Sequence, residues 1–218
     1  MWSNLKRLGR YLVDKEEYCV VIRAGQRDRN GYLPMPAVSD TNWAACKRTR
    51  KSTACFHISL GLQGPLMTVA RTQTIVADSS GTAEWYGGVS AAAEVLFSAD
   101  LADWLSLKVR PSLHMDSSAA IGISKRIGVG RLRTIEVKTL WLQQYLGGGT
   151  QQHRGGEAIP LQLYKVAGEH NCADVGTKNL AAARLQYLLG MCGTERIARG
   201  AEPSASGVDC LPSTPWTL

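Results

Sequence analysis

The sequence predicts an α/β fold, a mixed five-stranded sheet with helices on both faces. Segments typical of strands and segments of helical periodicity follow one another in the order β-β-β-α-β-α-α-β-α. The first three strands have no helix between them, and Gln63-Gly64 offers a tight turn between the second and the third. The sheet is therefore expected to begin antiparallel and to continue through helical crossovers.

The N-terminal part of the chain predicts a helix followed by three strands. Residues 2–13 carry apolar side chains at helical spacing with basic residues between them, which is typical of an amphipathic helix. Pro34 and Pro36 should delay the first strand, because proline cannot donate to a β-ladder. The three strands are expected at about 37–45, 54–62 and 65–72.

A long helix is expected next, over about 82–98, after the N-terminal signal Ser79-Ser80-Gly81. Glu84 would lie in its first turn, with Gly87 and Gly88 on the same face. Two interior glycines cost about 1 kcal/mol each in helix propensity. That cost predicts a close approach of the helix to the sheet, or access for a ligand.

The remaining elements alternate between strand and helix. A strand begins no earlier than Pro111 and ends at Asp116, and a second strand covers about 159–166. Helices are expected at about 118–126, at 135–146 and from about 173 onward. Beyond about residue 200 the composition is typical of a disordered tail.

Composition and charge limit the class of protein. The 218 residues, 44% of them apolar, suit one domain with extensions, and residues 1–51 contribute most of the net charge of +7. Concentrated basic charge favours a polyanionic partner, nucleic acid first and an anionic membrane second, although solvated basic loops are an equal alternative. No apolar run approaches the roughly 20 residues of a transmembrane helix, and the charged start excludes a signal-peptide core. The chain is expected to be intracellular, in the cytoplasm or nucleus, without a membrane partner.

Four acids stand where a predicted strand or helix begins or ends. They are Asp40, Glu84, Asp116 and Asp174. Strand ends are where sites form in such folds, so the four carboxylates are expected to converge and to bind Mg²⁺, which prefers oxygen ligands. Taken singly, the last three have a structural alternative, since an acid near a helix start favours the helix dipole or caps it. Asp40 is harder to explain in that way, because it lies inside a strand.

Six motifs, in order along about residues 2–181, carry a resemblance. They are Leu5-Lys6-Arg7 to Tyr11-Leu12, Ser39-Asp40-Thr41-Asn42-Trp43, Thr49-Arg50-Lys51-Ser52-Thr53, Ala77-Asp78-Ser79-Ser80-Gly81-Thr82-Ala83-Glu84-Trp85-Tyr86, Asp116-Ser117-Ser118-Ala119-Ala120 and Ala173-Asp174-Val175-Gly176-Thr177-Lys178. Together they resemble the ribonuclease H domain of copia-type retrotransposon Pol polyproteins. The chain departs from that pattern where Asn42 replaces an acid, where Thr82 replaces a glutamate and where Thr134 replaces a histidine.

The resemblance implies a ribonuclease H-like fold and a metal-dependent endoribonuclease that hydrolyses the RNA strand of RNA:DNA hybrids during reverse transcription. Two Mg²⁺ ions, with Mn²⁺ as an alternative, would be the cofactors. By resemblance Asp40 would bridge both ions, Asp174 would complete the ion that activates water, and Glu84 with Asp116 would hold the other ion. A catalytically decayed retroelement remnant that only binds nucleic acid is the alternative.

The resemblance also implies a domain division and partners. Residues 1–32 would be a connection helix and linker from a preceding reverse transcriptase region, 33–185 the ribonuclease H-like domain, and 186–218 a largely disordered extension. The expected partners are an RNA:DNA hybrid and a reverse transcriptase domain of the same polyprotein. Basic residues expected to bind the phosphates of the hybrid are Lys47, Arg48, Arg50, Lys51, Arg131 and Arg133.

Overall fold

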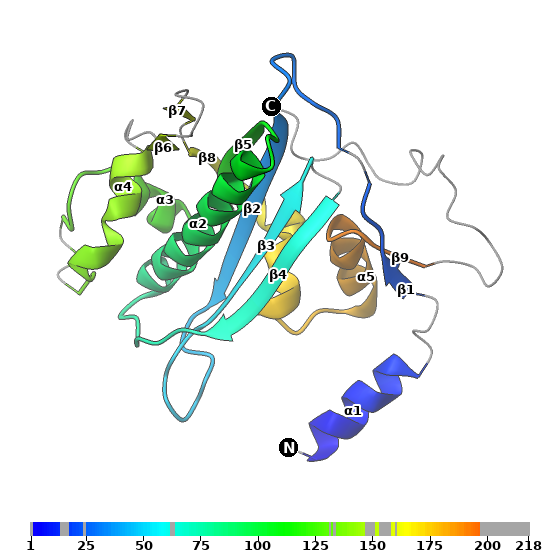
Figure 1. The fold of residues 1–218 in the computed structure, drawn as a ribbon. Coiled ribbons are helices and arrows are strands. Elements are labelled where there is room, and N and C mark those ends of the chain that lie inside the picture. The colour runs from blue at the N-terminus through cyan, green and yellow to red at the C-terminus, as the bar shows by residue number, and fades with distance from the viewer. Residues whose placement is uncertain are drawn as a thin grey trace.

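A mixed five-stranded sheet forms the centre of the protein in the computed structural model (Figure 1). The structure describes residues 2–13, 18–23, 25–61, 64–130, 132, 134–146, 151–152, 158–159 and 161–196. The strands are β2 (Leu33–Asn42), β3 (Thr53–Leu60), β4 (Gly64–Thr72), β5 (Val109–Met115) and β8 (Gln162–Lys165). Their order in the sheet is β4-β3-β2-β5-β8. The predicted mixed sheet of five strands is confirmed.

The sheet combines an antiparallel half with a parallel half. β3 pairs antiparallel with both β2 and β4, as the predicted antiparallel start requires. β5 pairs parallel with both β2 and β8, and helical crossovers make these connections. Of the predicted turn Gln63-Gly64, Gln63 lies outside the described residues and Gly64 begins β4.

Helices cover both faces of the sheet. One face packs against α2 (Ser80–Trp104), with α3 (Ser118–Ser124) and α4 (Trp141–Leu146) beside it, around the fully buried Trp85. The 3₁₀ helix η3 (Cys172–Gly176) contacts β2 and β3, and α5 (Ala182–Met191) packs against η3 behind the sheet (Figure 1). The prediction of helices on both faces is confirmed.

Smaller elements surround this centre. They are α1 (Trp2–Leu12), β1 (Tyr18–Val20), η1 (Val137–Thr139), β6 (Gln151–Gln152), β7 (Ala158–Ile159), η2 (Gly168–His170) and β9 (Thr194–Arg196). β1 pairs with β9, and the guanidinium of Arg23 donates to Glu195 Oε2 at 2.7 Å. The expected boundary after residue 185 falls within α5, residues 197–218 lie outside the described part, and the domain division stays a prediction. Among the described helices, none is long and apolar enough to cross a membrane.

The prolines do not delay the strands as predicted. β2 begins at Leu33 and includes Pro34 and Pro36, and β5 begins two residues before Pro111. Leu33 N–H donates to Lys108 O, and backbone N–H groups on one side of a strand recur every second residue. The N positions of both β2 prolines therefore face β3, whose registered pairs with β2 begin only at Ala37. Pro34 and Pro36 therefore lack N–H groups only at positions where β2 has no registered pair with β3.

Two predicted helices are shorter or divided. The helix expected at 135–146 is η1 followed by α4, and the helix expected from about 173 is η3 followed, after a loop, by α5. η3 lies tightly against the sheet, because a Cβ on Gly176 would stand 2.5 Å from Cys55 Sγ. By contrast, α2 extends beyond its predicted bounds at both ends.

Candidate metal centre

Asp40 lies in β2, and Asp116 directly follows the neighbouring parallel strand β5 at the same end of the sheet. Ser39 of β2 pairs in register with Met115 of β5, so the next residue on each chain is one of the two acids. Neighbouring strands are about 4.8 Å apart, which sets the separation of the two backbones. The parallel register therefore brings together two carboxylates that are far apart in the sequence.

Glu84 reaches this end of the sheet from α2. Its Oε1 accepts a hydrogen bond from the Thr41 backbone N–H at 3.2 Å. A Cβ on Gly87 would stand 2.4 Å from Thr41 Oγ1, and a Cβ on Gly88 would stand 2.5 Å from Met115 Sδ. The predicted close approach of this helix to the sheet is confirmed, and the two glycines permit it.

The structural alternatives for Glu84 and Asp116 are weakened, whereas Asp174 does lie in the first turn of η3. α2 begins at Ser80 and is capped by Ser79, so Glu84 lies beyond the first turn, contrary to prediction, and beyond the strongest part of the helix dipole. Ser117, not Asp116, caps α3 by accepting from the Ala120 N–H at 3.2 Å. Capping therefore does not account for Asp116, and the dipole does not account for Glu84.

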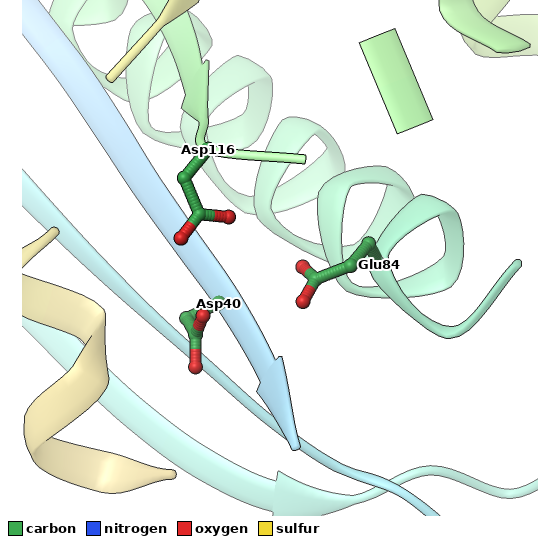
Figure 2. A group of neighbouring side chains, drawn as sticks. All are labelled: Asp40, Glu84 and Asp116. Carbon is green, nitrogen blue, oxygen red and sulfur yellow. The ribbon is translucent and has the colours of Figure 1, made fainter. Parts of the chain in front are cut away.

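The carboxylates of Asp40, Glu84 and Asp116 form one cluster, which we call the acidic triad. One oxygen from each residue lies within 4.8 Å of the corresponding oxygens of the other two. Figure 2 shows the three side chains pointing toward a common centre from β2, from α2 and from the end of β5. Three converging carboxylates provide the hard oxygen ligands that Mg²⁺ and Mn²⁺ prefer.

Glu84 shows that the acidic triad fits a cation. Its side chain is 9% exposed, and its Oε2 accepts no hydrogen bond from any described residue. Burial, followed by the negative charges of Asp40 and Asp116, raises the pKa of Glu84 to about 8. A buried polar atom without a partner is rare in folded proteins. A divalent ion among the three carboxylates would satisfy this oxygen and offset the repulsion between them.

Asp174 lies outside the acidic triad but is connected to it. It belongs to η3, whose N-cap is Asn171. Lys178 Nζ donates to Asp174 Oδ1 at 2.6 Å and to Asp40 Oδ1 at 3.1 Å, so one ammonium joins the two acids. Burial raises the pKa of Asp174 although the bond from Lys178 opposes this effect. The structure thus brings three of the four predicted acids into one cluster and places the fourth beyond a lysine.

Two residues at this site were not among the predicted site residues. Thr177 donates its hydroxyl to Asp40 Oδ2, and Lys178 contacts both carboxylates. Burial lowers the pKa of Lys178, but its interactions with Asp174 and Asp40 outweigh burial and raise it. The i,i+4 spacing of Asp174 and Lys178 is a signal in the sequence that could have predicted their ion pair.

The predicted phosphate-binding residues are only partly within the described chain. Lys47, Arg48, Arg50 and Lys51 lie in the connection between β2 and β3, which extends beyond the end of the sheet (Figure 1). The first three are exposed, and Lys51 is half-buried. Arg131 and Arg133 lie outside the described residues. A basic loop therefore follows the strand that carries Asp40, and its binding role stays a prediction.

Comparisons with known proteins give no family assignment and find solved structures that align at low sequence identity. No protein-family profile matches the chain, and no curated protein matches it. An RNase H1 isolated from compost by a metagenomic approach (LC11-RNase H1) aligns with a TM-score of 0.40 and 14% identity over 66% of this chain and 90% of that one. The same enzyme in complex with an RNA/DNA hybrid aligns with a TM-score of 0.37 and 12% identity over 64% of this chain and 88% of that one. RNase H1 from the halophilic archaeon Halobacterium salinarum aligns with a TM-score of 0.37 and 14% identity over 73% of this chain and 98% of that one.

Proposed function

We propose that the chain is a metal-dependent endoribonuclease that hydrolyses the RNA strand of RNA:DNA hybrids. The observation that carries the proposal is the acidic triad, in which a buried oxygen of Glu84 has no partner among the described residues. The sequence motifs around the four acids support the assignment to ribonuclease H chemistry. Mg²⁺ is the proposed cofactor, with Mn²⁺ as a substitute, because carboxylates alone form the cluster.

In this proposal the residues of the chain have separate tasks. Asp40, Glu84 and Asp116 would hold one divalent ion, and Asp40 with Asp174 would hold a second. When bound, two such ions supply an activated water and stabilise charge on the attacking and leaving oxygens. The Thr41 N–H fixes Oε1 of Glu84, and the Thr177 hydroxyl fixes Oδ2 of Asp40, so neither carboxylate can rotate freely. Orientation of this kind is what a preorganised metal site requires.

Selection of the substrate would depend on contacts outside the acidic triad. The exposed basic loop at 47–51 is suited to bind phosphates without regard to base sequence. An RNA:DNA hybrid has an A-like minor groove that displays 2′-hydroxyls on one strand, and a ribonuclease H must recognise these groups. We assign the loop to phosphate binding and the triad to cleavage.

The biological context in this proposal is reverse transcription by a copia-type retrotransposon. The six motifs in family order support it, as does the helix at residues 2–12, which resembles the segment that joins the reverse transcriptase to the ribonuclease H domain in such polyproteins. The proposed partner is therefore a reverse transcriptase domain of the same polyprotein, and the proposed location is the cytoplasm or nucleus.

Cleavage of an end-labelled RNA:DNA hybrid tests the proposal. The wild-type chain with Mg²⁺ should cut the RNA strand and leave an all-DNA duplex intact. Asp116→Asn should abolish cutting, because it removes one charged ligand of the triad, whereas Asp100→Asn on the exposed side of α2 should retain it. Circular dichroism would establish that each variant is folded. A folded wild-type chain that binds the hybrid without cutting it would refute the proposed activity and support the remnant that only binds.

A further inference from the structure

Lys178 places its ammonium between Asp40 and Asp174. Its Nζ lies 3.1 Å from Asp40 Oδ1 and 2.6 Å from Asp174 Oδ1. The two carboxylate side chains are 2% and 8% exposed, whereas the lysine side chain is 42% exposed. One cation of the chain itself therefore joins two buried acids, and its side chain remains partly accessible to solvent.

The remaining oxygens of these two acids also have protein partners. Asp40 Oδ2 accepts a hydrogen bond from the Thr177 hydroxyl. Asp174 Oδ2 faces the guanidinium of Arg184 at 3.8 Å. Glu84 is different, because its Oε2 has no partner among the described residues. The side of the site formed by Asp40 and Asp174 is thus neutralised within the protein, and the side that contains Glu84 is not.

An ion and this ammonium cannot occupy the same position. Mg²⁺ binds oxygen at about 2.0–2.1 Å, so an ion held by Asp40 Oδ1 and Asp174 Oδ1 would lie where the lysine nitrogen lies. The positive charges of the ion and of the ammonium also repel each other at short range. The second ion and the ammonium therefore compete for the same two oxygens.

We propose that Lys178 acts as a competing cation that occupies the second metal position in the free protein. The chain then binds one divalent ion tightly, at the acidic triad, and a second ion binds only after displacing the ammonium from Asp40 and Asp174. The flexible four-carbon stem of Lys178 allows that displacement toward solvent. The inference rests on the proposed function, because it concerns the second ion of the same site.

Binding of Mn²⁺ in the absence of nucleic acid tests this inference. Free Mn²⁺ is measured by electron paramagnetic resonance during titration of the wild-type chain and of Lys178→Met, which keeps an unbranched stem and removes the charge. The wild type should bind one ion tightly and a second weakly. Lys178→Met should bind the second ion about tenfold more tightly or better, because the competing charge is gone. Lys125→Met, an exposed lysine at the end of α3, should behave as the wild type.

Two further variants assign each ion to its ligands. Asp174→Asn added to Lys178→Met should remove the gained ion, and Asp116→Asn should remove the first ion. If Lys178→Met does not fold, Lys178→Gln retains a neutral donor for the two carboxylates and replaces it in the titration. Equal binding by the wild type and the folded Lys178 variant, whatever the number of ions, would overturn the inference. Failure of the wild type to cut a hybrid while its ions bind as described would refute only the proposed function.

Discussion

Replacing Glu84 by glutamine tests whether the acidic triad holds a buried, protonated carboxyl group when no metal is bound. Burial, with the charges of Asp40 and Asp116, raises the pKa of Glu84 from 4.5 to about 8. Between these values the folded state binds more protons than the unfolded state, so the free energy of unfolding falls as pH rises. From pH 5 to pH 8 this group should lower the stability by about 3 kcal/mol. Glu84→Gln has no proton to lose and should not show that fall.

The assay is urea unfolding in chelator at the two pH values, for the wild type and for Glu84→Gln. Glu94→Gln, on the same helix, is the matched control and should follow the wild type. At pH 5 the two chains should differ little in stability, because the protonated Glu84 carboxyl is neutral, as the amide is. Mg²⁺ should stabilise the wild type at pH 8 more than the variant, since the ion binds the ionised carboxylate. Parallel pH dependence of wild type and Glu84→Gln would refute the reasoning.

Two other predictions concern the approach of α2 to the sheet and the basic loop. Gly87→Ala should lower the free energy of unfolding by about 1–3 kcal/mol in urea, because its Cβ would stand 2.4 Å from Thr41 Oγ1. Gly122→Ala, in α3 with no atom within 4 Å of the new Cβ, should instead stabilise by up to about 1 kcal/mol. Neutralising the basic residues of the loop at 47–51 should weaken binding to RNA:DNA hybrids of any base sequence. The slope of log affinity against log salt should become shallower by about 0.9 for each phosphate that the variant no longer neutralises, and an unchanged slope would exclude the loop from the interface.

The fold could be predicted because its main elements have strong local signals. The helical spacing in α2 and the serines before α2 and α3 act within a few residues. The pairing of β1 with β9 has no such signal. Each strand has three residues, and Arg23 and Glu195 form the ion pair beside them from opposite ends of the described chain. Only the folded chain brings these segments together.

The site could be predicted in part for a related reason. Asp40 and Asp116 were expected at strand ends, and the parallel register of β2 and β5 accounts for their meeting. Lys178 was missed because a sequence does not show which of two acids a flexible side chain will contact. The contact with Asp174 follows from their spacing, but the contact with Asp40 depends on how η3 packs against the sheet. Side-chain positions at a junction of distant segments are set by tertiary packing.

The acidic triad is costly for the stability of the fold, and this cost is itself an argument for a bound cation. Ionised carboxylates that face one another in a buried site repel, and a Glu84 oxygen without a partner loses its hydration. An amide or apolar side chain at this position would avoid the loss of stability at neutral pH. Buried polar groups without a hydrogen-bond partner occur most often at functional sites, where a ligand supplies the missing interaction. A divalent cation would supply the positive charge that offsets this repulsion and a partner for Glu84 Oε2.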